Sequence, residues 1–318
     1  MFVRELVDGQ DIAQVLLVRE RELRVGGDGG EYLRLMLGDR TGAVAAVVKE
    51  HVPDLAPLCE AGAPVAVEGR YAVHPRYGPE LTLRSLRRAE AHEYDLADLV
   101  DGPARPVRHM EQALRELIAQ VRSPHLRALL DRLLGPDAPT WRAFRDAPAA
   151  KRYHQAYRHG LLEHTLSVGE AVAVISTTFP HIDRDVAITG ALLHDVGKLD
   201  AYTVEPLAID LTDLGKLHGE IALGYFRVRT AIEGIAGFPD ELAAAVLHII
   251  LSHHGQLEHG SPVVPCTREA TLVHMIDNLG GKLGSFDRLE KALPNGSSWS
   301  AYDRALGGGA YFAARQAA

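Results

Sequence analysis

Histidine and aspartate residues recur inside apolar stretches in the second half of this 318-residue chain. They occur, in order, as His164 in GLLEHTLSVGEA, His194 and Asp195 in ALLHDVGK, His253 and His254 in ILSHHG, and Asp277 in LVHMIDNLGG. An isolated imidazole or carboxylate is costly to bury unless a partner compensates for it, and both groups are ligands for divalent metal ions. A single such residue is more often an ordinary core residue. Their recurrence in the order H…HD…HH…D predicts one metal site.

Some of these residues also have simpler interpretations when each is taken alone. His253 and His254, followed by Gly255, are typical of a helix end, where cationic side chains and a glycine are favoured. Asp277 has a candidate ion-pair partner in Lys282. The metal interpretation is preferred because it accounts for all of the residues at once.

The segments around these residues have the spacing of helices, with apolar residues at about every third or fourth position. Helices are expected over residues 110–134 (with a break at Pro124), 160–179, 183–194, 220–232, 241–252 and 268–283. The first part of the chain differs, because five strand candidates separated by glycine and proline lie at 15–25, 31–39, 43–50, 64–73 and 80–88. Five short strands predict a small barrel, of the OB-fold type or, as the alternative, SH3-like. The stretch 102–108 between the two parts is expected to be a linker.

Composition excludes several classes of protein. The 34 basic and 42 acidic residues give a net charge of −8, which argues against a protein that coats nucleic acid by bulk charge. Two distant cysteines exclude a disulfide framework and a thiolate zinc site. No apolar run is long enough for a membrane span, and the charged start MFVRELVDGQ does not have the pattern of a signal peptide. A cytoplasmic protein without a membrane partner is expected.

The helical part resembles a known group of nucleases in four stretches: APAAKRYHQAYRHGLLEHTLSV, GALLHDVGK, LHIILSHHGQLEHGSPVVPCTREA and MIDNLGGKL. These stretches are similar to the YhaM-like 3′–5′ exoribonucleases of the HD-domain phosphohydrolase superfamily. The resemblance implies a multidomain protein in which a small β-barrel of the OB-fold type precedes an all-α HD domain. The implied limits are an OB-fold nucleic-acid-binding domain over 1–91, a linker and helical connector over 92–139, and a metal-dependent HD domain over 140–318.

The resemblance also implies a set of metal ligands. His164, His194, Asp195 and Asp277 are expected to hold one ion, and Asp195 is expected to bridge to a second ion held by two further residues, His253 and His254. Lys198 follows Asp195 by three residues and shares its helix face, so it is expected to contact a phosphate or the attacking water. A surface ion pair is the alternative for Lys198.

One stretch departs from the family pattern GxLxGHIxxG, because the chain has GKLHGEIALG there. Glu220 occupies the family's ligand position, and His218 lies two residues earlier. Since glutamate is also a ligand for hard or borderline cations, the second site is expected to use Glu220 or His218. Gly280 likewise replaces an acidic residue of the family. We expect these departures to affect the number of bound metal ions and the substrate preference more than the hydrolytic type of the reaction.

The implied activity is hydrolysis of single-stranded RNA from its 3′ end to nucleoside monophosphates by a metal-activated water, with single-stranded DNA as an open second substrate. Two divalent ions are expected, Mn²⁺ or Co²⁺ first, while Fe, Ni and Zn also suit mixed imidazole and carboxylate ligands. A barrel of this type would hold the strand by base stacking and backbone contacts, and Tyr32 is a candidate for stacking. Arg152 and Arg158, beside the helix that carries His164, are candidates for phosphate contacts. The resemblance further favours a homo-oligomer.

Two other functions compete with this one. The first is an HD-domain nucleotidase or cyclic-nucleotide phosphodiesterase whose barrel is regulatory. The second is a strand-binding protein that has lost catalysis through Glu220 and Gly280.

Overall fold

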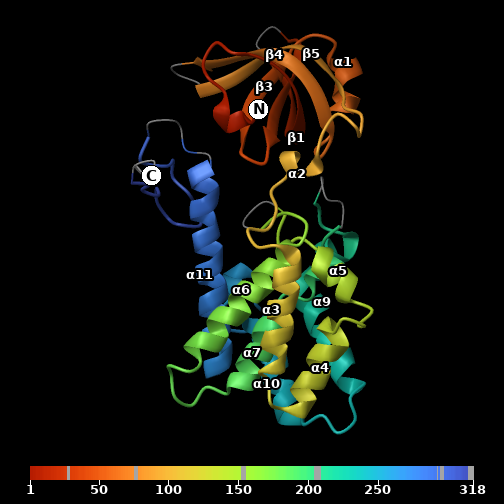
Figure 1. Ribbon diagram of the computed structural model, residues 1–318, viewed down its shortest axis with the longest axis vertical. Helices are drawn as coiled ribbons and strands as arrows, with labels where there is room; N and C mark the ends of the chain where they lie inside the picture. Colours follow the sequence, from red (N-terminus) through yellow and green to blue (C-terminus); the bar gives the residue numbers. More distant parts are fainter. Residues whose placement is uncertain are drawn as a thin grey trace.

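The computed structural model describes residues 1–26, 29–74, 78–151, 155–203, 209–291, 293 and 297–313. It consists of an N-terminal β-barrel followed by a helical domain, with a short connector between them (Figure 1). The predicted fold class is therefore confirmed.

The barrel has five strands, and each overlaps one of the five stretches for which the sequence predicts a strand. They are β1 (Asp11–Val25), β2 (Glu31–Asp39), β3 (Gly42–Val48), β4 (Pro64–His74) and β5 (Gly78–Arg88). The strands close in the order β1-β2-β3-β5-β4, with β3 and β5 parallel and the other pairs antiparallel. This is the five-stranded barrel of an OB-fold. Two short elements lie between β3 and β4, namely α1 (Val52–Leu55) and the 3-10 helix η2 (Ala56–Leu58).

The alternation of side chains along β2 explains how the barrel is packed. Leu33, Leu35 and Leu37 are fully buried in the barrel core, whereas Tyr32 and Arg34 lie on the opposite face of the strand. The first residues of the chain form the 3-10 helix η1 (Val3–Glu5) against this core.

Asp39 at the end of β2 is a buried carboxylate, and its oxygen atoms accept hydrogen bonds from two backbone N–H groups. Asp39 Oδ2 accepts from the backbone N–H of Val3 at 2.6 Å, and Oδ1 accepts from that of Thr41 at 2.7 Å. The start of the chain is therefore attached to the barrel through a buried charge.

The helical domain has one continuous apolar core that runs from Met110 to Ile276. The helices α6 (Gly160–Ile175), α7 (Arg184–Leu193) and α10 (Asp240–Ser252) are apolar on nearly every face, which is typical of helices at the centre of a domain. The helices α3 and α4 of the predicted connector pack in this same core, while the predicted domain limits stay predictions. The elements are α2 (Leu96–Leu99), α3 (Val107–Ala119), α4 (Pro124–Leu134), α5 (Trp141–Asp146), α6 (Gly160–Ile175), α7 (Arg184–Leu193), α8 (Lys198–Ala201), α9 (Asp213–Glu233), α10 (Asp240–Ser252), η3 (Leu257–His259) and α11 (Arg268–Lys291).

In Figure 1, α11 stands along one side of the helical domain and rises toward the barrel. Helix α2 lies in the connector, directly below the barrel. Within the described part of the chain, no helix has the length and apolar character needed to cross a membrane.

Candidate metal centre

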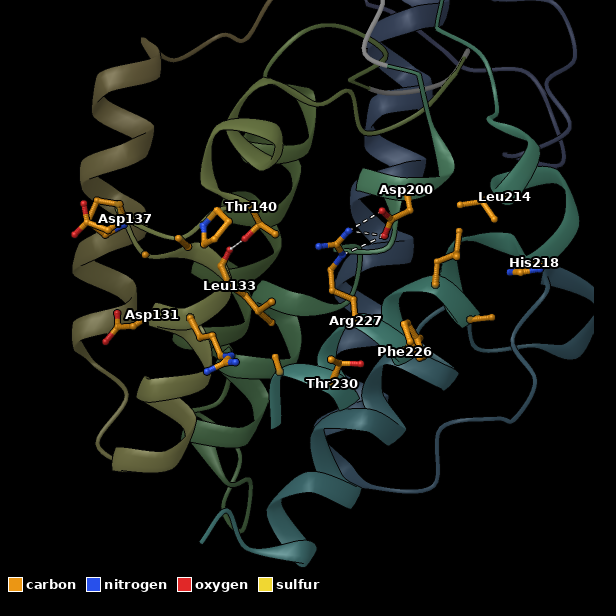
Figure 2. A pocket seen from close by; sticks show the side chains of 18 residues that line it. Asp131, Leu133, Asp137, Thr140, Asp200, Leu214, His218, Phe226, Arg227 and Thr230 are labelled. Carbon is orange, nitrogen blue, oxygen red and sulfur yellow. Dashed lines mark hydrogen bonds and ion pairs between the residues drawn. The ribbon is translucent and has the colours of Figure 1, made fainter. Parts of the chain in front are cut away.

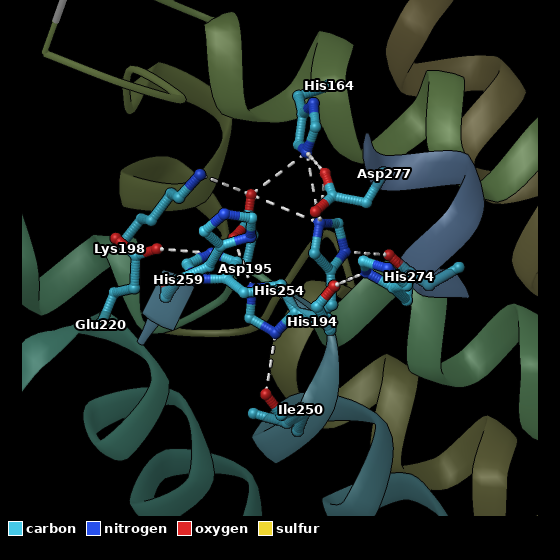
Figure 3. A network of polar contacts seen from close by, with 12 residues as sticks. His164, His194, Asp195, Lys198, Glu220, Ile250, His254, His259, His274 and Asp277 are labelled. Atoms are coloured by element: carbon cyan, nitrogen blue, oxygen red, sulfur yellow. Dashed lines mark hydrogen bonds and ion pairs between the residues drawn. The ribbon is translucent and has the colours of Figure 1, made fainter. Parts of the chain in front are cut away.

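Several helices meet at one place in the helical domain, and each supplies a polar side chain there, in most cases from its first or last turn (Figure 3). His164 lies in the first turns of α6, whereas His194 and Asp195 directly follow the last residue of α7. His253 and His254 directly follow α10, and Asp277 lies within α11. Because a helix end leaves backbone groups unpaired, the chain there is already polar, and side chains of this kind are easier to accommodate.

The first group of donor atoms comprises His164, His194 and Asp277. The two Nε2 atoms of the histidines are 3.2 Å apart. Asp277 Oδ1 lies 3.1 Å from His164 Nε2 and 3.8 Å from His194 Nε2. Three donor atoms within this distance of one another can share a single cation.

The second group comprises Glu220, His253 and His254. Glu220 Oε1 lies 3.2 Å from His254 Nε2. His253 is fully buried, and its ring lies edge-on to that of His254 with the centroids 4.4 Å apart. The family's histidine position is thus filled here by a carboxylate that points toward the same histidine pair.

Asp195 lies between the two groups. Its Oδ2 is 3.2 Å from His164 Nε2 and 3.3 Å from His194 Nε2, while its Oδ1 is 3.6 Å from His253 Nε2. One carboxylate oxygen therefore faces each group. Lys198 Nζ is 2.7 Å from Oδ2, so the ammonium lies beside the shared carboxylate.

Backbone carbonyl groups fix how three of the imidazoles are protonated. The Nδ1 atoms of His194, His253 and His254 lie 2.7, 2.8 and 2.9 Å from the carbonyl oxygens of Ala191, Ile250 and His259. A carbonyl oxygen can only accept, so each Nδ1 is the donor in its contact, and Nε2 is the ring nitrogen left to face the site. This arrangement of the outer nitrogen is common in metal-binding histidines.

Asp195 Oδ2 and His253 Nε2 are inaccessible to solvent, and neither has a hydrogen-bond partner with acceptable geometry among the described residues. The ammonium of Lys198, 2.7 Å from Asp195 Oδ2, compensates the charge of that oxygen as an ion pair. Buried polar atoms are normally satisfied, so an atom of this kind points to a missing partner. Imidazole nitrogens together with carboxylate oxygens suit a divalent transition-metal ion, and the residues present therefore fit the metal that an HD domain requires.

The electrostatics of the centre depend on mutual contacts. Burial lowers the pKa of His164, but its contacts with Asp195 and Asp277 outweigh that effect and raise the pKa to about 9. Burial raises the pKa of Asp195, and the neighbouring Lys198 and His194 outweigh it, so this pKa lies well below its usual range. Likewise, Asp195 and Glu220 overcome the desolvation of Lys198 and raise its pKa. The shared carboxylate is therefore ionised and the lysine is charged.

The pKa values of His253 and His254 shift in opposite directions, although burial lowers both. Burial lowers the pKa of His253 and is the dominant influence there. It also lowers that of His254, but the contact with Glu220 outweighs it and raises the pKa. The second group therefore combines one imidazole that prefers to be neutral with one that pairs with a carboxylate.

His218 does not belong to this centre, and its expected role as an alternative ligand is corrected. The side chain is exposed and lines a separate cavity of about 1460 Å³ together with Leu214 and Phe226 (Figure 2). The reason is the break in α9 at Gly219, whose φ of 74° and ψ of 154° interrupt the helix between the two candidates. Glu220 therefore faces the metal centre while His218 faces the other side.

The candidate substrate contacts are not gathered at the centre in the same way. Arg158 precedes α6 and pairs with Asp146 at 3.1 Å, with about half of its side chain exposed. Tyr32 is partly buried on the face of β2 opposite the barrel core. Arg152 lies outside the described residues.

The contacts that hold the histidines in place were not predicted from the sequence. The carbonyls of Ala191 and Ile250 each lie three residues before the histidine that they bind, a spacing that a helical end makes predictable. His274 Nδ1 lies 2.8 Å from the carbonyl oxygen of His253. Gly255 has a φ of 80°, and a Cβ there would lie 2.0 Å from the His274 ring. No local sequence signal predicts these last two contacts.

Comparisons with known proteins agree with this geometry. A family model described as "HD domain" matches residues 161–281, a range that contains both groups, Asp195 and Lys198. Among curated proteins, the 3′-5′ exoribonuclease YhaM of Bacillus velezensis is 30% identical over 288 residues, with 90% of each chain covered. That of Bacillus subtilis is 29% identical over 288 residues, again with 90% of each covered. That of a Geobacillus species is 30% identical over 291 residues, covering 90% of this chain and 87% of the relative.

Among solved structures, an aspartyl tRNA synthetase from Entamoeba histolytica is 12% identical, covers 54% of this chain and 35% of that chain, and has a TM-score of 0.21. This likeness is too weak to inform the fold. The curated relatives, in contrast, match along both the barrel and the helical domain. The chain is a hydrolytic nuclease and belongs to the YhaM family of HD-domain 3′–5′ exoribonucleases.

Proposed function

We propose that this protein hydrolyses single-stranded RNA from its 3′ end and releases nucleoside monophosphates. The observation that carries the proposal is the placement of Asp195, which directs one carboxylate oxygen to each of two groups of metal-binding side chains (Figure 3). The named activity of the curated relatives supports the same reaction and direction.

Two divalent cations would be held by this arrangement. His164, His194 and Asp277 would hold the first, while Glu220, His253 and His254 would hold the second, with Asp195 shared. When bound, a pair of such ions supplies positive charge to the phosphoryl oxygens and acidifies a water molecule. Mn²⁺ or Co²⁺ is our first choice because of the resemblance to the family, while the mixed imidazole and carboxylate ligands suit Fe, Ni and Zn as well.

Lys198 is the side chain of the centre best suited to act on the substrate. Its ammonium lies 2.7 Å from Asp195 Oδ2 and is charged, so it holds the shared carboxylate ionised and in place. The same ammonium can pair with a phosphate oxygen of the scissile bond, since it needs no proton exchange to remain positive. We therefore assign Lys198 and Asp195 as the catalytic residues.

The barrel supplies the strand-binding surface in this proposal. In barrels of this type the outer face of strands β2 and β3 takes up single strands by stacking on aromatic rings. Tyr32 lies on that outer face of β2 and is our candidate for stacking, while Arg152 and Arg158 are candidates for phosphate contacts near the metal centre. Cleavage of single-stranded DNA, a cytoplasmic location and homo-oligomerisation stay predictions.

The decisive experiment compares Asp195→Asn with the unaltered protein on a 5′-labelled single-stranded RNA in the presence of Mn²⁺. Asp213→Asn is the matched control, because its side chain is 97% exposed and lies outside the centre. We expect stepwise shortening by the unaltered protein and by the control, and loss of shortening with retained RNA binding in Asp195→Asn.

Nucleoside triphosphates and cyclic nucleotides are tested in parallel. Turnover of these mononucleotides without shortening of RNA would replace the exonuclease proposal with the nucleotidase or phosphodiesterase alternative. Equal RNA turnover by Asp195→Asn would show that the activity comes from elsewhere.

A further inference from the structure

The connector, residues 95–105, is attached to both parts of the protein. Its last part falls in the stretch 102–108 that was expected to be a linker, and a linker without contacts would leave the barrel free to move. Instead, hydrogen bonds and ion pairs join this segment both to the barrel and to the helices of the metal centre.

On the barrel side, two arginines hold the connector. The backbone N–H of Arg40 donates to the carbonyl of Asp98 at 2.9 Å. Arg19 Nη2 donates to the carbonyls of Asp39 at 2.9 Å and Leu99 at 3.1 Å, so one guanidinium joins the end of β2 to α2. Leu99 itself is buried. These contacts fix the connector against β1 and β2.

On the helical side, the central contact is the carboxylate of Glu163. This side chain is buried, and its Oε1 accepts the backbone N–H of Ala104 at 2.8 Å, while its Oε2 accepts the hydroxyl of Tyr157. Glu163 directly precedes His164 on α6. The connector is thus joined to the residue beside a metal-binding histidine.

Two ion pairs extend this attachment. Arg105 Nη1 lies 2.9 and 3.1 Å from the two carboxylate oxygens of Glu170 on α6. Lys291 at the end of α11 donates to Asp101 at 2.6 Å. Helices α6 and α11 carry His164 and Asp277, so the connector is attached to the helices that supply two of the three residues of the first group.

We propose that the connector holds the barrel at a fixed distance from the metal centre, with Glu163 and Arg19 as its positioning residues, so that this distance sets the shortest RNA that engages both. The inference rests on the proposed function, because it assumes that the barrel binds the strand that the metal centre cleaves. An RNA shorter than the distance between the barrel and the metal centre cannot contact both. The rate at which the RNA is shortened therefore falls sharply at one length. A released segment of this size would let the barrel wander over roughly 15 Å, which blurs that length.

The first test measures the distance without RNA. Spin labels are placed at Lys49→Cys on the barrel and Glu241→Cys on α10, in a Cys266→Ser background; both label positions are exposed, and the remaining cysteine, Cys59, is buried. We expect a narrow distance distribution that becomes about twofold wider in Glu163→Gln and in Arg19→Ala. Arg229→Ala, which removes an exposed pair with Glu233 on α9, is the matched control and should leave the width unchanged.

The second test follows the final product length of a 5′-labelled single-stranded RNA. We expect one narrow class of residual lengths for the unaltered protein and the control, and a spread over several lengths for both variants. Hydrolysis of bis(p-nitrophenyl) phosphate, which is too small to reach the barrel, should change less than twofold. If Glu163→Gln lost activity on this small substrate without a wider distance distribution, Glu163 would support the metal centre itself and would not position the barrel.

The two variants keep the test decisive, because Arg19 lies on the barrel and does not touch the metal centre. Unchanged distance widths and unchanged residual lengths in both variants would overturn the proposal, as would a broad distribution in the unaltered protein. Failure of the unaltered protein to shorten RNA would instead contradict the proposed function, while the distance measurement would still decide whether the connector is rigid.

Discussion

The barrel and the helical domain differ in what they bury. Among the described residues of the barrel, Asp39 is the single buried charged side chain, and the interior is otherwise built from residues such as Leu33, Leu35 and Val65. The helical domain is equally apolar in most of its core but concentrates buried imidazoles, carboxylates and an ammonium at one place. Such burial is sustained only where the polar groups compensate one another or share a ligand.

This difference indicates where each part keeps its chemistry. The helical domain keeps its reactive groups inside, where neighbours control their charge. The barrel keeps its polar side chains on the outer faces of its strands, where solvent controls their charge. If the contrast is correct, changes in the metal centre should affect turnover and leave the barrel intact, and changes on the barrel surface should affect binding and leave turnover intact.

The largest expected effect comes from His194→Ala. The substitution removes a donor atom from the first group, and turnover should fall by about 1,000-fold because several kcal/mol of transition-state stabilisation are lost. His92→Ala, on an exposed residue outside the helical domain, is the control. Initial rates on single-stranded RNA measure the effect, and fluorescence anisotropy should show nearly unchanged RNA binding. Equal losses of binding and turnover would contradict the separation of roles.

Removal of metal should destabilise the helical domain but not the barrel. Binding that stabilises only the folded state adds about 2.7 kcal/mol at a free ligand concentration of 100 times Kd. We therefore expect the thermal unfolding of the helical domain to shift to lower temperature after dialysis against a chelator, and to recover when Mn²⁺ is returned. Amide hydrogen exchange assigns the change to a region of the protein. Equal losses of protection in β1–β5 would contradict the expected difference between the barrel and the helical domain.

Gly255→Ala should disturb the second group selectively. The left-handed backbone and the close His274 ring leave no room for a Cβ, so the change should cost about 2 kcal/mol of stability and displace His253 and His254. Metal analysis should then find fewer ions per chain. Gly280→Ala is the matched control, because a Cβ at this helical position meets nothing within 4 Å. Two ions retained in Gly255→Ala would contradict this account of the second group.

Metal affinity should rise with pH. The folded pKa of His164, about 9, lies above its ordinary value of 6.5, so the metal-free protein carries a proton there at neutral pH that a metal ion must displace. The stability from this proton is fully present below about pH 6.5 and is lost as the pH rises through 9. Affinity should therefore increase by up to about tenfold per pH unit from 7 to 9. Calorimetry in buffers of different ionisation enthalpy measures the released proton, and its absence would contradict the assignment.

The smallest expected effect belongs to the barrel surface. Tyr32→Ala should weaken binding of single-stranded RNA by roughly fivefold, since stacking of one base is worth about 1 kcal/mol at the lower end of its range. Turnover at saturating RNA should not change. Tyr32→Phe, which keeps the ring, is the control. A loss in both variants would indicate a role for the hydroxyl group, and a fall in maximal turnover would place Tyr32 in the reaction rather than in binding.

The same contrast explains what the sequence allowed us to predict. Strands and helices followed from alternation and from helical spacing, and His164, His194, Asp195 and Asp277 stood out because each interrupts an apolar stretch. The choice between His218 and Glu220 was not predictable, because it depends on the backbone break at Gly219. Arg158 pairs with Asp146 in the structure, and its contact with phosphate stays a prediction.

The contacts of the connector were also beyond sequence analysis. Their partners include backbone groups, such as the N–H of Ala104 and the carbonyl of Leu99, which every residue possesses. A pattern of side chains carries no information about which of these groups will be used. The roles of residues on the barrel surface could not be predicted either, because an exposed tyrosine or arginine is common on any strand.

The attachment of Val3 to Asp39 has a practical consequence for anyone who shortens this chain. Deleting the first few residues would remove the N–H that holds a buried negative charge at 2.6 Å and would expose the apolar surface beneath η1. The barrel would then tend to open at that end and aggregate, even though the deleted residues lie far from the metal centre. Expression tags are better joined in front of Met1 than substituted for the residues that follow it.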